Sequence, residues 1–434
     1  MPLLITRPRG TADIIPGEVE KWQYVEESFR RICREYGYAE IRTPVFEHTE
    51  LFHRSVGEAT DIVEKEMYTF QDRSNRNLSL RPEGTAPIAR AYLENNLFAG
   101  PLPVKLYYLG SMFRYDRPQA GRYRQFHQLG IEVFGSSDPA IDAEVMAMAM
   151  DFCRRLGLQL ELQVNNVGCG RCRPVLQEQL QAYFRSCLNG LCNDCRQRFE
   201  RNPLRILDCK VDRCRELARQ AAAGLNCLCD ECAAHFQAVR KHLGELNVKY
   251  EVNSCLVRGL DYYTKTAFEI MAPNIGAQGS VGGGGRYDGL IETCGGPPTP
   301  GIGYAFGLER LLLAVQEQGI PVPGRERPDV FLVTVDAALE GEALKLLQVL
   351  RQQGLAADKD YLGRSLKAQM KYAGKSGIPL VVILGGNEFK QGMVALKDMT
   401  TGSQEEIALA SLAAEVYKRC RPKIPEMPAK RSTD

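Results

Sequence analysis

The sequence lacks a long hydrophobic run, and it lacks an excess of charge of either sign. No run of about 18 apolar residues occurs, so no membrane-spanning helix is expected. Residues 1–18 contain no apolar segment long enough for a signal peptide. With 55 basic and 53 acidic residues the net charge is +2, so no global basic field draws the chain onto nucleic acid. We expect a cytoplasmic protein without a membrane partner, whose nucleic-acid contacts, if any, come from local patches.

The length and composition are those of a multidomain globular protein. A chain of 434 residues exceeds one ordinary hydrophobic core, which predicts two or three domains. Apolar residues make up 44% and charged residues 25%, as in soluble globular proteins. There is no internal repeat. Fifteen cysteines without a secretory signal indicate free thiols or metal ligands in a reducing compartment rather than a disulfide framework.

Changes in composition divide the chain. Residues 153–255 hold twelve of the fifteen cysteines and predict an inserted, mainly helical module at about 170–245. This module interrupts a first α+β segment, residues 1–325, which ends in a linker rich in Pro, Gly and charge. Strand and helix patterns then alternate over 328–420, which predicts a separate small α/β domain. The basic, Pro-rich tail, residues 421–434, is expected to be disordered.

Local patterns predict several elements of the first segment. Helical spacing of apolar residues covers Glu18 to Tyr36, and Gly37 stands where a helix C-cap is expected. Residues 38–47 predict a strand that Pro44 interrupts. Residues 78–94 predict a strand, a turn and a helix, with Thr85 as the N-cap.

The segment Arg114 to Gly135 carries the clearest functional signal. It places four arginines within a short span and then alternates in the manner of a strand, whose side chains repeat every two residues. One face then presents Phe126, Gln128 and Glu132, while the apolar face includes His127, which we interpret as structural. The polar face could hold an anion, a planar base and a small hydrogen-bonding molecule together. The alternative is a solvated basic hairpin.

Five segments in this order closely resemble one enzyme family over nearly the whole chain. They are RPEGT, FRYDRPQAGRYRQFHQLGIEVFG, LVRGLDYY, GGGGRYDGL and GIGYAFGLER. Together they resemble histidyl-tRNA synthetases, which are class II aminoacyl-tRNA synthetases. The resemblance implies an antiparallel sheet flanked by helices, a helical insertion and a C-terminal α/β anticodon-binding domain. It also implies histidine-tRNA ligation through a histidyl-adenylate, with L-histidine, ATP and histidine tRNA as partners.

The resemblance assigns cationic residues to ATP, which would be accompanied by Mg²⁺. Negative charge develops at phosphorus in the transition state, so fixed cations there matter most. Arg114 and Arg258 are expected beside the α-phosphate and the histidine carboxylate as catalytic residues. The ATP-binding set is Arg114, Arg122, Phe126 and Arg310, with Phe126 stacked under adenine. Asp116 stands where the family usually has a glutamate, which leaves its contact with adenine in doubt. For each arginine taken alone, the alternative is a surface salt bridge.

The implied amino-acid pocket must accept an ammonium group and recognise both imidazole nitrogens. Glu83, Thr85 and Gln128 supply acceptors for the ammonium, and Glu132 and Tyr263 are expected at the ring nitrogens. Tyr262 and the glycines at 283–285 would form the walls. Taken alone, the two tyrosines could be ordinary sheet aromatics and Glu83 a solvated turn acid. The expected histidine-binding set is Glu83, Gly84, Thr85, Gln128, Glu132, Arg258, Tyr262 and Tyr263.

The inserted module contains three C-x-x-C pairs, a spacing that is typical of tetrahedral zinc sites. The candidate ligands are the thiols Cys169, Cys172, Cys192 and Cys195. The spacing between pairs is irregular, and enzymes of this family do not need such a metal. We therefore favour reduced cysteines that pack as small apolar side chains over structural zinc.

Basic residues suggest where tRNA binds. In the C-terminal domain, Arg364, Lys367, Lys371 and Lys375 form one stripe if this segment is helical, which would contact phosphates. A solvated helix face is the alternative. By resemblance, the inserted module reaches toward the acceptor stem through Arg196, Arg198, Arg201 and Arg205. Residues 38–47 resemble the segment that pairs subunits in this class, which predicts a homodimer.

Two rival functions remain open from the sequence. One is a non-catalytic, histidine-binding regulatory paralogue, but such relatives generally lack the C-terminal domain and have an eroded LVRGLDYY. The other is a class II ligase for a different amino acid. The segments RGLDYY and RQFHQLGIE favour histidine over other amino acids.

Overall fold

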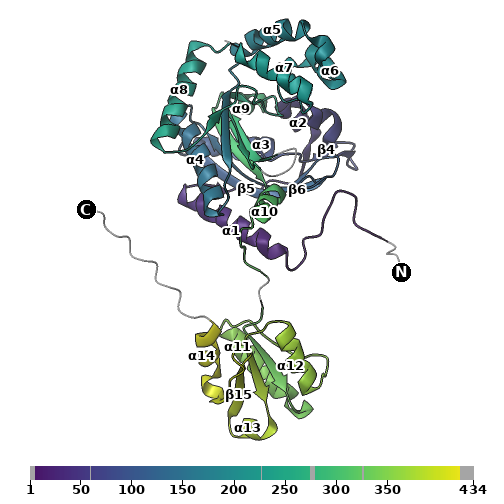
Figure 1. Cartoon of the computed structure of the whole chain (residues 1–434), viewed down its shortest axis with the longest axis vertical. Helices are drawn as coiled ribbons and strands as arrows, with labels where there is room; N and C mark the ends of the chain where they lie inside the picture. The colour runs from purple at the N-terminus through teal and green to yellow at the C-terminus, as the bar shows by residue number, and fades with distance from the viewer. Residues whose placement is uncertain (1–4, 59, 226, 274–278, 325–326, 421–434) are drawn as a thin grey trace, which may run out of the picture. The chain divides into compact units, whose positions relative to one another are not determined.

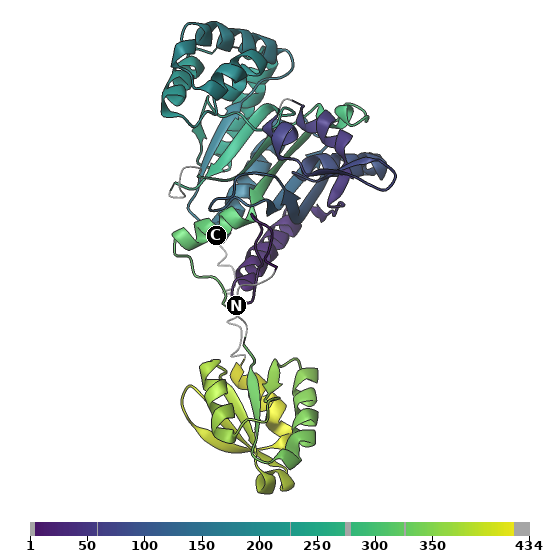
Figure 2. The ribbon, with the colours of Figure 1, turned by 90° about the vertical axis from the view of Figure 1, so that its right-hand side faces the viewer.

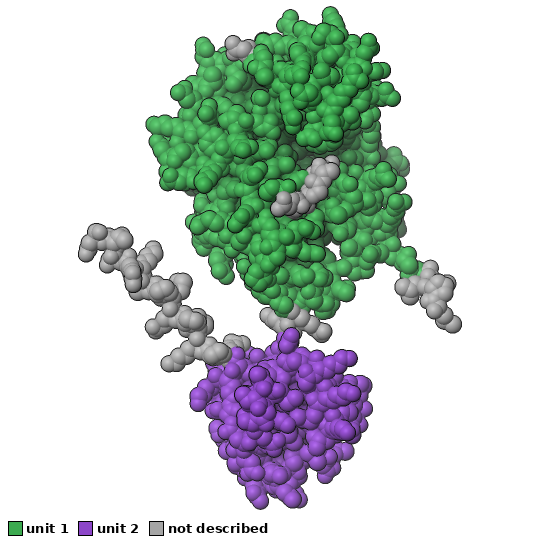
Figure 3. Space-filling model, in the orientation of Figure 1, with its two compact units in different colours: residues 1–324 green, residues 325–434 purple. Residues whose placement is uncertain are grey.

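The computed structural model describes residues 5–420, except residues 59, 226, 274–278 and 325–326, as two compact units. Unit 1 spans Met1–Gly324 and unit 2 spans Arg325–Asp434 (Figures 1 and 3). The tail at 421–434, for which disorder was predicted, lies outside the described residues. No helix among the described residues is long and apolar enough to cross a membrane.

Within its described part, unit 1 is built on an eight-stranded sheet, and the antiparallel sheet predicted from the sequence is confirmed. All pairings from β5 through β7 are antiparallel, and only the short edge strands β1 and β8 pair in parallel. The strands, in spatial order, are β1 (Ala39–Glu40), β5 (Val104–Phe113), β6 (Gln125–Phe134), β11 (Gly301–Gly307), β10 (Ser280–Arg286), β9 (Thr264–Met271), β7 (Glu161–Asn166) and β8 (Glu251–Val252).

Helices cover one face of this sheet. They are α1 (Val19–Glu35), α4 (Pro139–Arg155) and α10 (Leu308–Glu317). On α1 the apolar residues Val25, Phe29 and Ile32 are fully buried, because a spacing of three to four residues places them on one side of the helix. The helix ends as predicted, with Gly37 at φ +78°, a conformation that glycine adopts without strain.

The glycines of β10 let the strands approach closely. A Cβ on Gly284 would collide with the carbonyl oxygen of Gly303 on β11, and one on Gly283 would stand 2.8 Å from the Arg258 Nη1 atom. No other residue type fits these two positions without displacing backbone or the arginine. The run of glycines therefore fixes how near Arg258 lies to the sheet surface.

A second, three-stranded sheet carries the RPEGT segment. Its strands are β2 (Phe46–His48), β4 (Asn77–Leu80) and β3 (Thr69–Gln71), and its neighbouring helices are α2 (Thr49–Val56), η1 (Ile62–Glu66), α3 (Thr85–Glu94), η2 (Leu97–Ala99) and α9 (Leu290–Thr293). The expected strand over residues 38–47 is split into β1 and β2, with Pro44 between them.

Thr85 was expected to cap α3, and this was wrong. The N-cap position is Gly84, and the Glu83 carboxylate accepts hydrogen bonds from the backbone N–H groups of Thr85 and Ala86, both at 2.8 Å. The Thr85 hydroxyl instead donates to Glu132 at 2.7 Å. A carboxylate two residues upstream thus satisfies the helix N-terminus and leaves the threonine hydroxyl for the interior.

The inserted module is helical and has a small core of its own. It comprises α5 (Cys172–Arg185), η3 (Leu188–Gly190), α6 (Asn193–Arg201), η4 (Pro203–Ile206), α7 (Asp212–Ala223) and α8 (Asp230–Glu245). Helices α5, α6 and α7 form a separate lobe beside the main sheet, whereas α8 packs along α4 (Figures 1 and 2).

Unit 2 has a five-stranded sheet flanked by helices, which agrees with the α/β domain predicted from strand and helix alternation. The strand order is β13 (Ala357–Lys359), β12 (Val330–Thr334), β14 (Leu380–Leu384), β15 (Met393–Asp398) and β16 (Gln404–Ala408). Its helices are η5 (Ala337–Leu339), α11 (Glu340–Gln352), α12 (Leu366–Lys375), α13 (Gly386–Lys390) and α14 (Leu409–Cys420).

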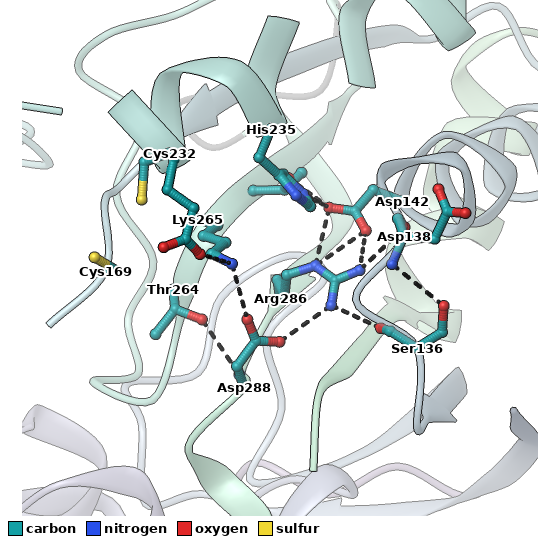
Figure 4. A network of polar contacts seen from close by, with 12 residues as sticks. Ser136, Asp138, Asp142, Cys169, Cys232, His235, Thr264, Lys265, Arg286 and Asp288 are labelled. Atoms are coloured by element: carbon teal, nitrogen blue, oxygen red, sulfur yellow. Dashed lines mark hydrogen bonds and ion pairs between the residues drawn. The ribbon is translucent and has the colours of Figure 1, made fainter. Parts of the chain in front are cut away.

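A buried ionic network ties the module to the sheet. Asp142 on α4 accepts hydrogen bonds from His235 on α8 at 2.9 Å, Thr266 on β9 at 2.6 Å and the Arg286 Nε atom on β10 at 3.0 Å (Figure 4). Both Asp142 and Arg286 are fully buried. Burial alone would raise the pKa of Asp142, but the hydrogen bonds from His235 and Arg286 lower it. Four elements distant in sequence thus share one charge pair.

Replacing Asp142 by Asn should lower the free energy of unfolding of unit 1 by about 3–5 kcal/mol, because it removes the fully buried counter-charge of Arg286 and leaves this guanidinium only the partly exposed Asp288. The matched control is Asp151→Asn on the same helix, whose partners Arg154 and Arg155 are exposed, and it should cost no more than about 1 kcal/mol. Denaturant unfolding followed by circular dichroism measures both. Equal losses of unfolding free energy in the two variants would contradict a stabilising role for the buried Asp142–Arg286 pair.

Candidate functional site

Unit 1 contains a cavity of 930 Å³ between the main sheet, the RPEGT turn and the inserted module. All of the histidine-binding and ATP-binding residues predicted from the sequence line it except Gly84 and Glu132. The residues brought together are Glu83, Thr85, Arg114, Arg122, Phe126, Gln128, Arg258, Tyr262, Tyr263 and Arg310.

One half of the cavity is strongly cationic. Arg310 on α10 donates from Nη1 to the Ser280 carbonyl at 2.6 Å, and Arg114 donates from Nε to the Pro82 carbonyl at 2.8 Å. Burial lowers the pKa of Arg310, and the positive charges of Arg122 and Arg114 lower it further. Backbone carbonyls orient these guanidinium groups without neutralising them. Such a cluster is suited to a polyanion.

Arg258 reaches the cavity from the LVRGLDYY segment and is held by an acid. Its Nη1 atom donates to the Glu269 Oε1 atom on β9 at 2.9 Å, and the Ser280 hydroxyl donates to the same oxygen at 2.9 Å. The module holds the segment from the other side, because Arg205 donates to the carbonyls of Arg258 at 3.3 Å and Gly259 at 2.9 Å. Glu269 was not predicted, although a lone acid inside the apolar strand sequence TAFEIM is a usable signal.

A planar slot lies beside the arginines. The Arg114 guanidinium stands over the Phe126 ring, 5.3 Å from its centroid. Asp116 also lines the cavity, but its carboxylate accepts hydrogen bonds from Arg122 Nη1 at 3.0 Å and from the Arg117 backbone N–H at 2.6 Å. The shorter acid at this position therefore orients an arginine.

The other half of the cavity presents acceptors and phenols. The Glu83 side chain is 2% exposed, and burial raises its pKa against the opposing effect of the hydrogen bonds from Ala86 and Thr85. The Tyr262 hydroxyl donates to Glu83 Oε2 at 3.4 Å. A buried carboxylate that borders the cavity is a good acceptor for an ammonium group.

Three buried polar atoms on the cavity wall have no hydrogen-bond partner among the described residues. They are Gln128 Oε1, Arg258 Nε and the Tyr108 hydroxyl. Leaving such a group unpaired costs about 1–3 kcal/mol, so a polar ligand that forms hydrogen bonds with these atoms would bind more tightly. Tyr108 was not predicted. Gly84 leaves room for the Tyr108 ring, because a Cβ at this position would collide with it.

Glu132 lies behind the cavity wall. Its carboxylate accepts hydrogen bonds from the hydroxyls of Thr85 and Tyr287, and both of these residues line the cavity. A Cβ at Gly303 would collide with the Glu132 carboxylate, so this glycine gives the acid its space. Burial raises the pKa of Glu132 to about 8, against the lowering effect of the hydrogen bonds from Tyr287 and Thr85.

His127 points to the opposite face of β6, as predicted. Its Nδ1 atom lies 2.9 Å from Glu309 Oε1 and its Nε2 atom 3.0 Å from the Ser111 hydroxyl oxygen. The Trp22 ring packs edge-on against it, with ring centroids 4.9 Å apart. The histidine therefore joins α1, β5 and α10 on the side of the sheet away from the cavity.

The inserted module contributes a basic wall that agrees with the expected one only in part. Arg205, which was predicted, lines the cavity, and so do Lys210, Arg215 and Arg219, which were not. Of the arginines named from the sequence, Arg198 and Arg201 instead pair with acids of η1 and its N-cap, each at 3.4 Å. Sequence proximity alone did not separate arginines that face the cavity from those that hold the module to η1.

The candidate metal ligands do not form one group. Cys169 and Cys172 lie with Cys229 and Cys232, whereas Cys192 and Cys195 lie with Cys209 and Cys214 in a second cluster. The four candidate thiols therefore do not share one site, because the helices bring each pair to two cysteines further along the chain.

In unit 2 the predicted basic stripe lies on α12. Lys367, Lys371 and Lys375 are exposed at successive turns of this helix. Arg364 precedes it, pairs with Asp360 at 3.3 Å and stands 4.6 Å from the Tyr372 ring centroid. The stripe is thus available at the surface of the unit.

Comparison with known proteins assigns both units. The family model for histidyl-tRNA synthetase matches residues 10–311, and the anticodon binding domain matches residues 329–419. A histidine–tRNA ligase of Pelotomaculum thermopropionicum is 65% identical over 94% of this chain and 96% of its own. One of Desulforamulus reducens is 62% identical over 96% of this chain and 100% of its own. The crystal structure of apo S. aureus histidyl-tRNA synthetase superposes with a TM-score of 0.79 at 41% identity, covering 95% of this chain and 100% of that one.

The raised pKa of Glu132 predicts a pH-dependent stability. Folding moves this pKa from 4.5 to about 8, so the folded state binds a proton that the unfolded state has lost between these values. The contribution of Glu132 to stability therefore falls as the pH rises from about 4.5 to about 8, by on the order of a few kcal/mol. In Glu132→Gln this loss should be absent, so its unfolding free energy should decline less over the same range.

Denaturant unfolding of wild type and variant at several pH values checks this prediction. Glu292→Gln, which alters an exposed acid on α9, is the control and should follow the wild-type curve. Parallel curves for wild type and Glu132→Gln would contradict a buried titrating carboxyl at this position.

Proposed function

The chain belongs to the histidyl-tRNA synthetase family, and we propose how the cavity of unit 1 carries out the ATP-dependent ligation of L-histidine to tRNA. The regulatory alternative is set aside, because the ligases that match at 65% and 62% identity align over nearly the whole chain, both units included. In the first step a histidine carboxylate oxygen bonds to the α-phosphorus of ATP, and the bond from that phosphorus to its bridging oxygen breaks. Pyrophosphate leaves, and histidyl-adenylate remains. In the second step a hydroxyl at the tRNA 3′ end attacks the histidyl carbonyl carbon, a proton is released and AMP leaves.

Arg114 and Arg258 stabilise the first transition state in this proposal. Negative charge grows on the α-phosphate while the carboxylate approaches, and both guanidinium groups border the same cavity. Glu269 and the hydrogen bonds from Arg205 to backbone carbonyls hold Arg258 in place before substrate binds, so little reorganisation accompanies the reaction.

Arg122 and Arg310 take the outer phosphates, and Phe126 stacks under the adenine ring. Such a stack contributes roughly 1–3 kcal/mol. Mg²⁺ accompanies ATP as the counter-ion of its phosphates and reduces their negative charge. Asp116 acts through Arg122, whose guanidinium it orients.

The histidine side chain and ammonium occupy the half of the cavity with acceptors and phenols. Glu83 and Gln128 receive the ammonium, and the free Gln128 Oε1 atom gains a donor. Tyr262 and Tyr263 form the walls of the pocket around the imidazole ring. Glu132 sets the hydrogen-bonding state of the pocket through Thr85 and Tyr287. An apolar side chain of similar size would leave these groups unpaired, so it should be rejected strongly.

The tRNA contacts both units in this proposal. The basic wall of the module at 170–245, with Lys210, Arg215 and Arg219, faces the cavity where the 3′ end must arrive. Residues 328–420 bind the anticodon arm, with the α12 stripe on phosphates. We further infer a cytoplasmic homodimer that pairs through residues 38–47.

One observation carries the proposal: four arginines, a planar slot and a buried acid pocket share a single cavity. Pyrophosphate exchange measured with each amino acid in turn tests it. Exchange that depends on histidine alone is the expected result. Histidine binding without exchange would favour a regulator, and exchange with another amino acid would assign a different ligase.

Replacing Arg258 by Gln should slow histidine-dependent pyrophosphate exchange by about 10²- to 10³-fold, because a preorganised cation is lost at the reacting phosphorus. The effect should fall on kcat more than on the KM for histidine. Arg117→Gln is the control, since Arg117 is exposed and lies outside the cavity lining. Comparable losses of exchange rate in both variants would show that the net positive charge of the chain matters and the position of Arg258 does not.

Replacing Lys367, Lys371 and Lys375 together by Ala should weaken tRNA binding and reduce its dependence on salt. Each lysine–phosphate ion pair that the substitutions remove should lower the slope of log K against log salt by about one unit. The control removes the exposed lysines Lys345 and Lys418 from other helices of unit 2. An unchanged slope in the triple variant would place tRNA binding elsewhere. Pyrophosphate exchange, which needs no tRNA, should be unaffected.

A further inference from the structure

Eight cysteines of unit 1 form two groups of four. Thiol cluster I contains Cys169, Cys172, Cys229 and Cys232, and thiol cluster II contains Cys192, Cys195, Cys209 and Cys214. Within each cluster all four sulfur atoms lie within 4.8 Å of one another. Each cluster joins segments that are separate in the sequence, and five of the eight thiols are buried.

The sulfur separations match one kind of site. The Cys169 Sγ atom lies 3.7 Å from that of Cys172 and 3.9 Å from that of Cys229, and the Sγ atoms of Cys192 and Cys209 are 3.9 Å apart. Disulfide sulfurs are about 2.05 Å apart, so these thiols are not bonded. In a zinc tetrathiolate with Zn–S bonds of about 2.3 Å, the edges of the tetrahedron are about 3.8 Å.

The backbone favours thiolates at both clusters. Cys172 begins α5, Cys229 is the N-cap of α8 and Cys192 is the N-cap of α6. Helix N-termini carry partial positive charge, which favours the deprotonated thiol that binds metal. Two N–H groups already point at sulfur: Cys229 N lies 3.2 Å from Cys172 Sγ, and Cys192 N lies 3.2 Å from Cys214 Sγ.

The module has little else to hold it together. Its core is small, and cysteine and alanine make up much of it. Small domains with thin cores need an additional stabilising element, and a structural metal is one such element. Cluster I connects the first helix of the module to its last, and cluster II connects α6 to α7 and the loop between them.

We propose that thiol clusters I and II each bind one Zn²⁺ as a closed tetrathiolate, giving two structural zinc sites per chain. The irregular spacing along the sequence favoured free thiols, but the fold pairs each of the first two C-x-x-C motifs with two cysteines further along the chain. Four thiolates in tetrahedral arrangement select zinc or iron among the common metals. With no open coordination position, the ions hold structure rather than react.

Cluster I stands next to the catalytic half of unit 1. Arg173, which follows Cys172, donates to the carbonyls of Asp261 at 3.0 Å and Tyr263 at 2.7 Å. On the far side Glu231, which precedes Cys232, pairs with Lys265 at 3.0 Å. Figure 4 shows Cys169 and Cys232 beside Lys265 and the Arg286 network. A metal here would fix the segment that carries the pocket tyrosines Tyr262 and Tyr263, immediately before β9.

Cluster II borders the cavity itself. Cys209 lines it, between Asp208 and Lys210, which also line it. Zinc at cluster II would therefore position the basic wall of the module. This consequence, unlike the metal sites themselves, rests on the proposed function.

Elemental analysis of the purified full-length protein, loaded with zinc under reducing conditions and desalted, tests the proposal. The expected result is two zinc ions per chain. Cys229→Ala and Cys214→Ala should each retain one, and the double variant none. The controls are Cys227→Ala, two residues from Cys229, and Cys187→Ala, both outside the clusters, which should retain two. Fewer than one zinc in wild type, or iron in its place, would overturn the proposal.

A second measurement on wild type does not depend on variants that fold. Co²⁺ added to the metal-free protein should give the intense visible bands of tetrahedral cobalt and sulfur-to-cobalt charge transfer, saturating at two equivalents. Weak bands of six-coordinate cobalt, or no uptake, would contradict tetrathiolate sites. Histidine-dependent pyrophosphate exchange by the zinc-loaded wild type reports separately on the proposed function, because it measures adenylate formation and not metal content.

Discussion

Several guanidinium groups buried around one cavity impose the main constraint on unit 1. Removing these charges from water is costly, and two of the four predicted arginines have direct ion pairs, Arg122 with Asp116 and Arg258 with Glu269. Backbone carbonyls orient the other two, that of Pro82 for Arg114 and that of Ser280 for Arg310. The positive potential that remains suits a polyanion, which in the proposed function is the polyphosphate of ATP. The sheet, the glycine run of β10 and the module hold these groups in place.

A buried charge is also shared among several elements away from the cavity. The Asp142–Arg286 pair is fully buried, and it carries hydrogen bonds from His235 and Thr266 as well. One ion pair thereby links α4, α8 and two strands of the sheet. Thiol cluster I lies at the N-terminus of α8, close to His235 on the same helix. The ionic network and thiol cluster I therefore attach the module to the rest of unit 1 in the same region. The module can then present Arg205 and its basic wall at fixed positions.

Much of the architecture could be predicted because it depends on local pattern. Apolar spacing in α1, alternation in β6 and the Pro44 break each follow from side-chain geometry within a few residues. The alternation also assigned Phe126 and Gln128 to one face and His127 to the other. Glu269 and Tyr108 escaped prediction, because their importance comes from neighbours more than ten residues away. Glu132 was expected at an imidazole nitrogen, and its carboxylate accepts hydrogen bonds from Thr85 and Tyr287, which both line the cavity.

By itself the sequence predicted the family, the antiparallel sheet with its helices, the C-terminal α/β domain and several of the residues that line the cavity, since these are encoded in motifs and short-range periodicity. Tertiary structure alone decided which cysteines meet, which basic residues of the module face the cavity and which atom caps α3. Those outcomes depend on how helices pack and turn relative to one another, and spacing along the chain does not specify distance in space. The cysteines show this most clearly: Cys169 and Cys172 lie with Cys229 and Cys232, and not with Cys192 and Cys195, which are nearer in the sequence.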